Sequence, residues 1–448
     1  MILCLAFSLA TSLDVATVGD STALLRLTAS SSLTPQVTNQ DPPTTPSPNS
    51  PQDPPTTPSP NGLQDVPAVP AGETRPATGE PETDVGGNPA PLPADNAFFL
   101  ERQLSGLGLG KHGIRVFGWT QGNYTASSAN DFNTPTAFND RADYFQLNQN
   151  WLEVVKTIDT TKSDVQFGAR LGLIVPGYDY KYTRTFDMWE TPGDRYGFDT
   201  TYMYAELYVP GVGPKGTTFR VGKWGTLIGY EMIEAIATPF VSRSYNFQYN
   251  PFTHTGVQAT TELNGGLTMY HGVVTGADVF VNDAATPGYV GGLKWTSEGG
   301  ATSVAANVFV TGLGWDTEES FQHYDSYNLL LQHTITEGWN YVLDATFGRT
   351  PDTADGSEQA TWWGLANYLS HALSDKVTLN LRGEVFRDAD GLRTGTDGTY
   401  VAVTAGLQWM PQDWLYLRPF ARFDRNSNGP FEGDDDLVTG GLEFIVRW

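Results

Sequence analysis

From residue 113 to the end, the chain is a series of about sixteen strand-length segments whose connections alternate between short and long. The segments lie near 113–124, 144–158, 164–178, 200–209, 217–226, 254–263, 266–275, 288–297, 300–312, 325–336, 339–349, 360–371, 375–387, 398–410, 413–425 and 436–448. Short turns such as 264–266, 297–300, 337–338 and 411–413 alternate with long loops near 125–143, 179–199, 227–253, 313–324, 388–397 and 426–435. An even number of strands with this alternation is typical of a bacterial outer-membrane barrel.

Apolar and polar residues alternate within these segments, which gives each strand one apolar and one polar face. Segment 375–387 shows the pattern: Val377, Leu379, Leu381 and Val385 oppose Thr378, Asn380, Arg382 and Glu384. A soluble β-sandwich also alternates, but its strands usually have about five or six residues. These segments run to about ten residues or more, which is what a tilted strand needs to cross a membrane. We therefore predict an all-β fold, a transmembrane antiparallel up-and-down barrel.

Composition supports this class and excludes others. The chain has 26 Lys and Arg against 50 Asp and Glu, which argues against nucleic-acid binding because that requires a basic surface. The mean hydropathy is −0.30, and no stretch has the roughly 20 consecutive apolar residues of a spanning helix. Aromatic residues make up 12% of the chain, as expected for a barrel with aromatic girdles.

The first 95 residues differ from the rest. The opening MILCLAFSLA predicts a secretory signal over 1–19, although the usual basic start is missing; a lipoprotein signal is a weaker alternative because Cys4 lies too near the start. Residues 20–95 contain 17 of the 29 prolines, and QDPPTTPSPN occurs twice. We therefore predict a disordered spacer in the periplasm; the alternative is a disordered tail without a function. A short helix or entry segment is expected over 96–112, followed by the barrel over 113–448. Cys4 is the only cysteine, so the exported chain would have no disulfide or cysteine site.

The chain ends on a strand-like run, GLEFIVRW, with an apolar face formed by Leu442, Phe444, Val446 and Trp448. A closed barrel leaves no free strand edge, so this last strand should pair with the first. The terminal aromatic residue resembles the signal that the barrel-assembly machinery recognises. The alternative is a terminal Trp on a soluble strand.

Three stretches resemble a known family: residues 116–159, LIGYEMIEA at 227–235 and YNPFTHTGVQAT at 249–260. They are similar to the putative β-barrel porin-2, or OmpL-like, family, associated mainly with planctomycetes and their relatives. The resemblance covers about 110–448 and excludes the proline-rich part. It implies an outer-membrane porin of a Gram-negative envelope and brings no substrate and no catalytic residues.

A barrel of about sixteen strands is too wide for side chains to fill, so we expect an aqueous channel. Charged residues on the inward faces would then influence conduction, since rings of charge set ion preference. The candidates are Arg115, Arg170, Arg220, Arg382, Arg418, Arg422, Glu153, Glu206, Glu262, Asp344 and Glu384. Both signs occur, so the selectivity stays open. The alternative is that these charges only pair across strands.

The connection 227–253 is too apolar and aromatic for a surface loop. We predict that it folds into the barrel and narrows the pore, burying Met232, Ile233, Ile236, Phe240 and Tyr245. The alternative is a loop that caps the rim.

Two other kinds of site receive little support. Asp424, Asn426, Asn428 and Asp435 approach calcium-loop spacing, but strands rather than helices flank them, so a solvated hairpin loop is favoured and no metal or cofactor is predicted. The six histidines are scattered and none pairs with a nucleophile in a motif, so no enzyme is predicted.

Passive diffusion of small hydrophilic solutes is thus the expected function. A plugged structural or adhesive barrel is the alternative. The expected partners are outer-membrane lipid, the barrel-assembly machinery and the solutes themselves. The oligomeric state stays open, with a homo-oligomer suggested only by analogy to other sixteen-stranded porins.

Overall fold

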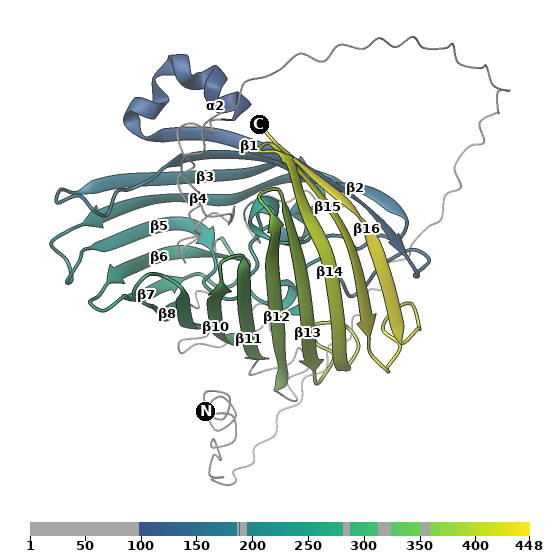
Figure 1. The fold of residues 1–448 in the computed structure, drawn as a ribbon. Coiled ribbons are helices and arrows are strands. Elements are labelled where there is room, and N and C mark those ends of the chain that lie inside the picture. Colours follow the sequence, from purple (N-terminus) through teal and green to yellow (C-terminus); the bar gives the residue numbers. More distant parts are fainter. Residues whose placement is uncertain (1–97, 186–187, 189–194, 281–286, 312–323, 351–358) are drawn as a thin grey trace, which may run out of the picture. The chain divides into compact units, whose positions relative to one another are not determined.

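The computed structural model describes residues 98–448 except 186–187, 189–194, 281–286, 312–323 and 351–358. The expected signal segment and proline-rich spacer therefore lie outside the described residues. The described chain forms a closed barrel of sixteen strands in which each strand pairs antiparallel with the next and β16 pairs with β1 (Figure 1). The predicted all-β, up-and-down barrel is confirmed.

Every expected segment corresponds to a strand, and each boundary agrees within three residues. The strands are β1 (Ile114–Ser127), β2 (Tyr144–Lys156), β3 (Gln166–Gly177), β4 (Gly197–Val209), β5 (Thr217–Gly225), β6 (Thr253–Glu262), β7 (Leu267–Val274), β8 (Gly288–Thr296), β9 (Thr302–Val310), β10 (Asp325–Thr336), β11 (Trp339–Thr350), β12 (Ala360–Ser374), β13 (Val377–Asp388), β14 (Gly398–Gln412), β15 (Leu415–Arg425) and β16 (Asp436–Arg447). The helices are short: α2 (Phe99–Leu104), η2 (Ser105–Leu107), η3 (Leu109–His112), α3 (Tyr180–Thr183), η4 (Ala235–Ala237) and α4 (Tyr245–Tyr249). Among the described residues, no helix is long and apolar enough to cross a membrane.

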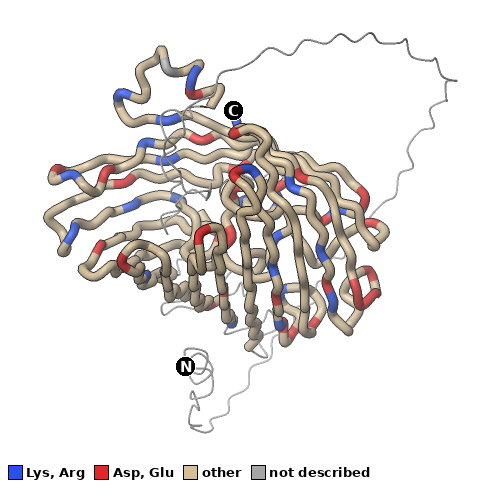
Figure 2. Tube along the Cα trace, in the orientation of Figure 1, with Lys and Arg blue, Asp and Glu red and all other residues tan. Residues whose placement is uncertain are grey.

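The two faces of each strand have opposite environments. In β14, Val403 and Trp409 are 56% and 47% exposed, whereas Ala402 and Thr404, the neighbours of Val403 along the strand, are buried. The apolar residues thus lie on the outside, where lipid surrounds a membrane barrel, and the polar residues lie inside. Figure 2 shows charged positions along the strands as well as in the connections. In β13 and β15 the inward ones are buried: Arg382, Glu384, Arg418, Arg422 and Asp424.

The last residue helps to close the barrel. The backbone of Trp448 exchanges two hydrogen bonds with Gly118 of β1, with N–O distances of 2.9 and 3.0 Å. Its indole Nε1 donates to Thr120 Oγ1 at 3.1 Å. Gly118 lies between the Trp448 ring and the carbonyl oxygen of Trp151, so a side chain at this position would collide with both. Recognition of the residues 442–448 by an assembly machinery stays a prediction.

We expect Gly118→Val to reduce barrel closure strongly, because the new Cβ overlaps both the Trp151 carbonyl oxygen and the Trp448 ring. Gly383→Val is the matched control, since Gly383 also lies in a strand but has no neighbouring atom within 4 Å of an added Cβ. The measurement is the fraction of protein that migrates as the folded, heat-modifiable band after refolding. Equal folded fractions for the two variants would contradict this account of the seam.

Candidate functional site: the segment inside the barrel

The connection between β5 and β6, residues 226–252, runs inside the ring of strands and is called the infolded segment below (Figure 1). Its hydrogen bonds reach distant parts of the wall. Leu227 O accepts from Asn307 of β9 at 2.7 Å, and Ile233 O accepts from Gln149 of β2 at 2.8 Å. Partners on β9 and β2 mean that the segment crosses the lumen rather than following one side.

The five residues expected to be buried in the lumen lie on this segment. Ile233, Phe240 and Tyr245 are buried, and Met232 and Ile236 are half-buried. The segment contains α4, and the N-cap residue Ser244 stabilises the start of this helix because its Oγ accepts a hydrogen bond from Phe247 N at 3.1 Å. A constricting role for the segment remains a prediction, since burial alone does not measure conduction.

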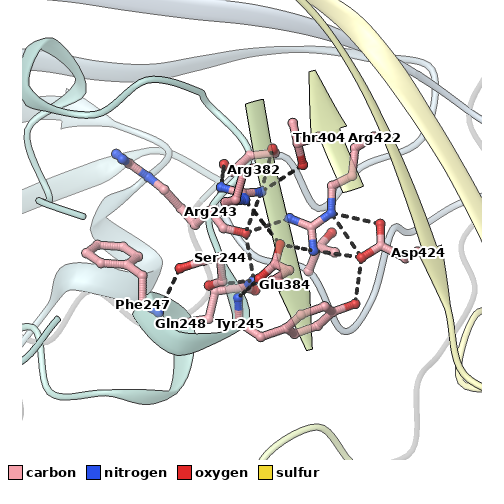
Figure 3. Close-up of polar contacts among 12 residues, drawn as sticks. Arg243, Ser244, Tyr245, Phe247, Gln248, Arg382, Glu384, Thr404, Arg422 and Asp424 are labelled. Atoms are coloured by element: carbon pink, nitrogen blue, oxygen red, sulfur yellow. Dashed lines mark hydrogen bonds and ion pairs between the residues drawn. The ribbon is translucent and has the colours of Figure 1, made fainter. Parts of the chain in front are cut away.

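One side of the infolded segment is held by a charged cluster, named the charged clamp: Glu231 together with Arg382, Glu384, Arg422 and Asp424 of the wall. Arg382 Nη1 donates to Glu231 Oε1 at 2.7 Å and to the carbonyl of Ser242 at 2.8 Å. Arg422 Nη1 donates to the carbonyl of Arg243 at 2.6 Å (Figure 3).

The same clamp also fixes α4. Tyr245 N donates to Glu384 at 2.8 Å, and the Tyr245 hydroxyl donates to Asp424 at 2.8 Å. The strand register explains why both carboxylates reach Tyr245: Glu384, Ala402 and Asp424 are neighbours across β13, β14 and β15. The small side chain of Ala402 leaves room between the two carboxylates for the infolded segment. Charge-assisted hydrogen bonds of this kind are about twice as strong as neutral ones.

Other wall arginines contact the first part of the segment. Arg170 of β3 bonds Glu234 at 2.7 Å, and Tyr202 of β4 donates to the same carboxylate at 2.8 Å. Arg418 of β15 donates to the carbonyl of Ala235 at 2.6 Å. The segment is thus tied to both halves of the barrel, which makes it a fixed part of the lumen in this structure.

Nine of the eleven expected lining residues are buried on the inward face: Arg170, Arg220, Arg382, Arg418, Arg422, Glu153, Glu206, Asp344 and Glu384. Of these, only Asp344 makes no ion pair among the described residues; it accepts from Tyr230 N at 3.1 Å. Arg115 pairs instead with Glu101 of α2, and Glu262 is exposed at the end of β6. Most of these charges therefore serve as cross-strand pairs, which was the alternative, and their effect on conduction stays a prediction.

The sequence analysis missed an uncharged polar wall on β1 and β2. Its buried residues are Gln121, Asn123, Thr125, Gln146, Asn148 and Gln149. They bond one another and the connections above them; Asn148 and Gln149 both donate to Asp179, at 2.7 and 2.9 Å. The stretch FQLNQNW contains the signal, because the amide residues Gln146, Asn148 and Gln149 in it are buried, although none of them is charged. The sequence analysis also missed Glu231, Glu234 and Arg243.

The two ends of the lumen differ in character. At the long-loop end, inward aromatic residues form part of one buried cluster: Phe138, Phe247, Tyr324, Trp362, Phe386, Tyr400 and Phe431. At the short-turn end, inward residues of β10 and β14 such as Gln332, Thr334 and Gln408 are polar and half-buried or exposed, whereas Phe117, Val155 and Tyr416 on β1, β2 and β15 are buried. The short-turn end is thus polar and exposed along β10 and β14, whereas the loop end is packed like a protein core.

Asp278, in the connection after β7, holds the exit of the infolded segment. Its carboxylate accepts hydrogen bonds from the backbone N–H groups of Phe252 at 3.1 Å and Thr253 at 2.7 Å. Burial raises the pKa of Asp278 to about 6, despite these bonds and the nearby Lys223. An unfolded Asp has a pKa of about 3.9, so between about pH 4 and 6 the folded protein holds a proton that the unfolded chain releases.

We therefore expect the free energy of unfolding of the wild type, relative to Asp278→Asn, to fall by about 2 to 3 kcal/mol as the pH rises from about 4 to about 7. The raised pKa sets the sign, because the protonated folded form is favoured only below about pH 6. Urea unfolding of both proteins in lipid vesicles across this range measures the difference. A difference that stays constant with pH would contradict the assignment.

The calcium-loop residues are not gathered at one point. Asp424 belongs to the charged clamp, Asn428 N donates to Asn426 Oδ1 at 3.1 Å, and the Asn428 amide donates to Asp397 O at 2.9 Å. In the part of the chain that the structure describes, no group of three or more His, Cys, Asp or Glu residues could hold a metal ion. His254 is buried, with ring nitrogens against Thr226 Oγ1 at 3.0 Å and Gly276 O at 2.9 Å.

The family to which the sequence is similar agrees with this architecture. The sequence model of the family described as Putative beta-barrel porin-2, OmpL-like, matches residues 113–447. No curated protein matches the chain.

Among solved structures, the outer membrane channel DcaP of Acinetobacter baumannii is similar at 11% identity and a TM-score of 0.49, over 75% of this chain and 97% of that chain. The anion-selective porin from Comamonas acidovorans is similar at 10% identity and a TM-score of 0.48, over 75% and 99%. The outer-membrane expressed OmpT of Vibrio cholerae is similar at 11% identity and a TM-score of 0.49, over 75% and 97%.

Proposed function

Since the chain belongs to the Putative beta-barrel porin-2, OmpL-like, family, we propose that its barrel conducts small hydrophilic solutes past the infolded segment, which sets the size limit. The chain is an outer-membrane β-barrel porin, and passive diffusion needs no further chemistry. A hydrated lumen removes the cost of moving a polar solute through lipid. The observation that carries the size limit is the path of residues 226–252 across the lumen, from Asn307 on β9 to Gln149 on β2.

Several finer points belong to this proposal. The strand residues on the outside would contact lipid, and residues 442–448 would be read by the barrel-assembly machinery. Export by a signal over 1–19, a periplasmic location of the spacer 20–95 and a planctomycete source rest on sequence patterns alone. That several copies form a homo-oligomer is proposed by analogy to other porins. An enzymatic role has no support from the buried, hydrogen-bonded His254.

A plugged structural or adhesive barrel remains the second candidate because of one observation. The loop end of the lumen is filled by the buried aromatic cluster that contains Phe138, Phe247 and Phe386. If this cluster never opens, solutes would enter the polar end and go no further.

Liposome swelling distinguishes the two functions. Vesicles containing the full chain should swell in isosmotic solutions of small sugars and stay unchanged with large oligosaccharides, because the infolded segment limits the passage. Protein-free vesicles are the control for leakage. Vesicles that hold folded protein but swell in none of the sugars would favour the plugged barrel.

A further inference from the structure

Three basic side chains gather at the long-loop end of the barrel and are called the basic rim below: Arg141, Lys181 and Arg195. Arg141 belongs to the connection between β1 and β2, and Lys181 and Arg195 belong to the connection between β3 and β4. The longer loops of an outer-membrane barrel lie on its extracellular side. The basic rim therefore belongs to the outer end of the molecule.

The ring of Tyr144 brings the two arginines of the basic rim together. The guanidinium carbons of Arg141 and Arg195 lie 5.6 and 5.2 Å from the centroid of this ring. Arg195 Nη1 also donates to the Tyr144 hydroxyl. Tyr144 is the direct partner of Thr125 across β2 and β1, and Thr125 is buried on the inward face. Direct partners project to the same side of a sheet, so Tyr144 and its two arginines lie at the mouth of the barrel and not against lipid.

Lys181 of α3 completes the basic rim. Its ammonium nitrogen lies 4.3 Å from the centroid of the Tyr178 ring. Burial lowers the pKa of Lys181, Asp140 opposes this shift, and the positive charges of Arg141 and Arg195 add to it. Lys181 is thus close enough to both arginines to be affected by their charges. Among the residues that the structure describes, no carboxylate lies within ion-pair distance of any of these three cations.

Asp140 is the carboxylate that acts on Lys181, and its oxygens are already in use. Its Oδ2 accepts from the hydroxyl groups of Tyr178 at 2.9 Å and Tyr182 at 2.6 Å, and its Oδ1 accepts from Gln146 Nε2 at 3.0 Å. These bonds direct the carboxylate toward the tyrosines. The whole chain has a formal net charge of −24, so a group of cations without ion pairs is not a general property of its surface.

The basic rim has the chemistry of an oxyanion site. A guanidinium group donates two parallel hydrogen bonds to a phosphate or carboxylate, and a lysine ammonium adds a point charge. Arg195 is exposed, and Arg141 and Lys181 are half-buried, so a dissolved anion reaches Arg195 directly. Phe132, which is 40% exposed, lies 4.8 Å from the Arg141 guanidinium carbon and offers an apolar surface beside the charges.

We infer that the basic rim binds the oxyanion group, phosphate or carboxylate, of a small solute at the outer mouth of the barrel. The inference goes beyond the proposed function, because binding at this site does not require that the barrel conducts. A lipid phosphate has the same chemistry, but the inward position of Tyr144 favours a dissolved ligand.

Calorimetric titration of the full chain, refolded in detergent micelles at low salt, tests the site with inorganic phosphate and with citrate. We expect saturable binding of both anions, and weaker binding in about 0.5 M sodium chloride because salt screens exposed charges. Arg195→Gln and Arg141→Gln should each weaken binding roughly tenfold, since each removes charge-assisted hydrogen bonds. Arg195→Lys should retain most of the affinity because the charge remains.

Arg425→Gln is the matched control. Arg425 is also an exposed arginine at the long-loop end, but it is paired with Asp436 at 3.3 Å, so its replacement should leave the affinity unchanged. A folded, heat-modifiable band is required of every variant. If Arg141→Gln folds poorly, the exposed Arg195 and its two variants decide the result.

Three outcomes would overturn the inference. The folded chain binds neither anion, or Arg195→Gln binds as tightly as the wild type, or Arg425→Gln loses as much affinity as Arg195→Gln. Purified lipopolysaccharide is the last titrant: if its binding depends on Arg195 while the dissolved anions do not bind, the site holds a lipid and not a solute. Absence of current in bilayers would contradict only the proposed function, since binding is measured without conduction.

Discussion

Replacing residues 226–252 with a four-residue Gly-Ser turn is expected to raise the single-channel conductance roughly two- to fivefold, because the lumen of a sixteen-stranded barrel is wide once no chain crosses it. The design is feasible because Gly225 and Thr253 are direct partners in the β5–β6 ladder, so a short turn can join them. The ladder itself uses no residue of the infolded segment. The measurement is the step size in planar bilayers, compared with the wild type in the same salt.

The barrel should survive this replacement. The pairs Arg422–Asp424 at 2.7 Å and Arg382–Glu384 at 3.1 Å lie within the wall itself, so neither pair needs the segment as a partner. A folded, heat-modifiable band is the control that the barrel has closed. If the replaced protein is folded and its step size equals that of the wild type, the segment does not limit the passage and the constriction proposal is wrong.

Arg382→Met is expected to destabilise the protein by about 3 to 5 kcal/mol, because it leaves Glu231 and Glu384 buried without their shared cation. The side chain of Arg382 and that of Glu231 are both fully buried, so water cannot replace the lost partner easily. We expect the infolded segment to detach from the clamp, which would add rapid current fluctuations to each open channel. Urea unfolding in lipid vesicles measures the first effect, and single-channel noise measures the second.

Arg425→Met is the matched control for this change. Arg425 lies on β15 and pairs with Asp436 at 3.3 Å, but the two side chains are 58% and 46% exposed. Exposed pairs contribute about 0 to 1 kcal/mol, so this variant should keep the stability and the quiet current of the wild type. Equal losses of stability in the two variants would show that burial of the clamp residues is not the reason why the clamp stabilises the protein.

The barrel was predictable from sequence because one rule governs all sixteen strands. In every strand, residues that face lipid alternate with residues that face the lumen. Val401, Val403 and Leu407 could therefore be assigned to the outside without knowing which strand pairs with theirs. The closing of β16 on β1 followed from the absence of free edges. These features depend on local periodicity, which a sequence displays directly.

The lumen was only partly predictable because its contacts join residues far apart in the chain. The composition of 227–253 indicated a segment that avoids water, and Tyr245 is indeed buried. Its bonds to Glu384 and Asp424, however, depend on the register of β13 to β15, which the sequence does not display. The amide wall of Gln121 and Asn148 was missed because uncharged residues were not considered as lining. The lining roles of Arg115, which pairs with Glu101 of α2, and of Glu262, which is exposed at the end of β6, stay predictions.

The central claim, a conducting barrel narrowed by its own infolded segment, is tested most directly by recording the full chain in planar lipid bilayers. We predict discrete, stable current steps with a reproducible reversal potential in a salt gradient, and larger steps when residues 226–252 are replaced. A folded, heat-resistant barrel that inserts into the bilayer and carries no current would contradict the claim and identify the aromatic cluster at the loop end as a permanent plug.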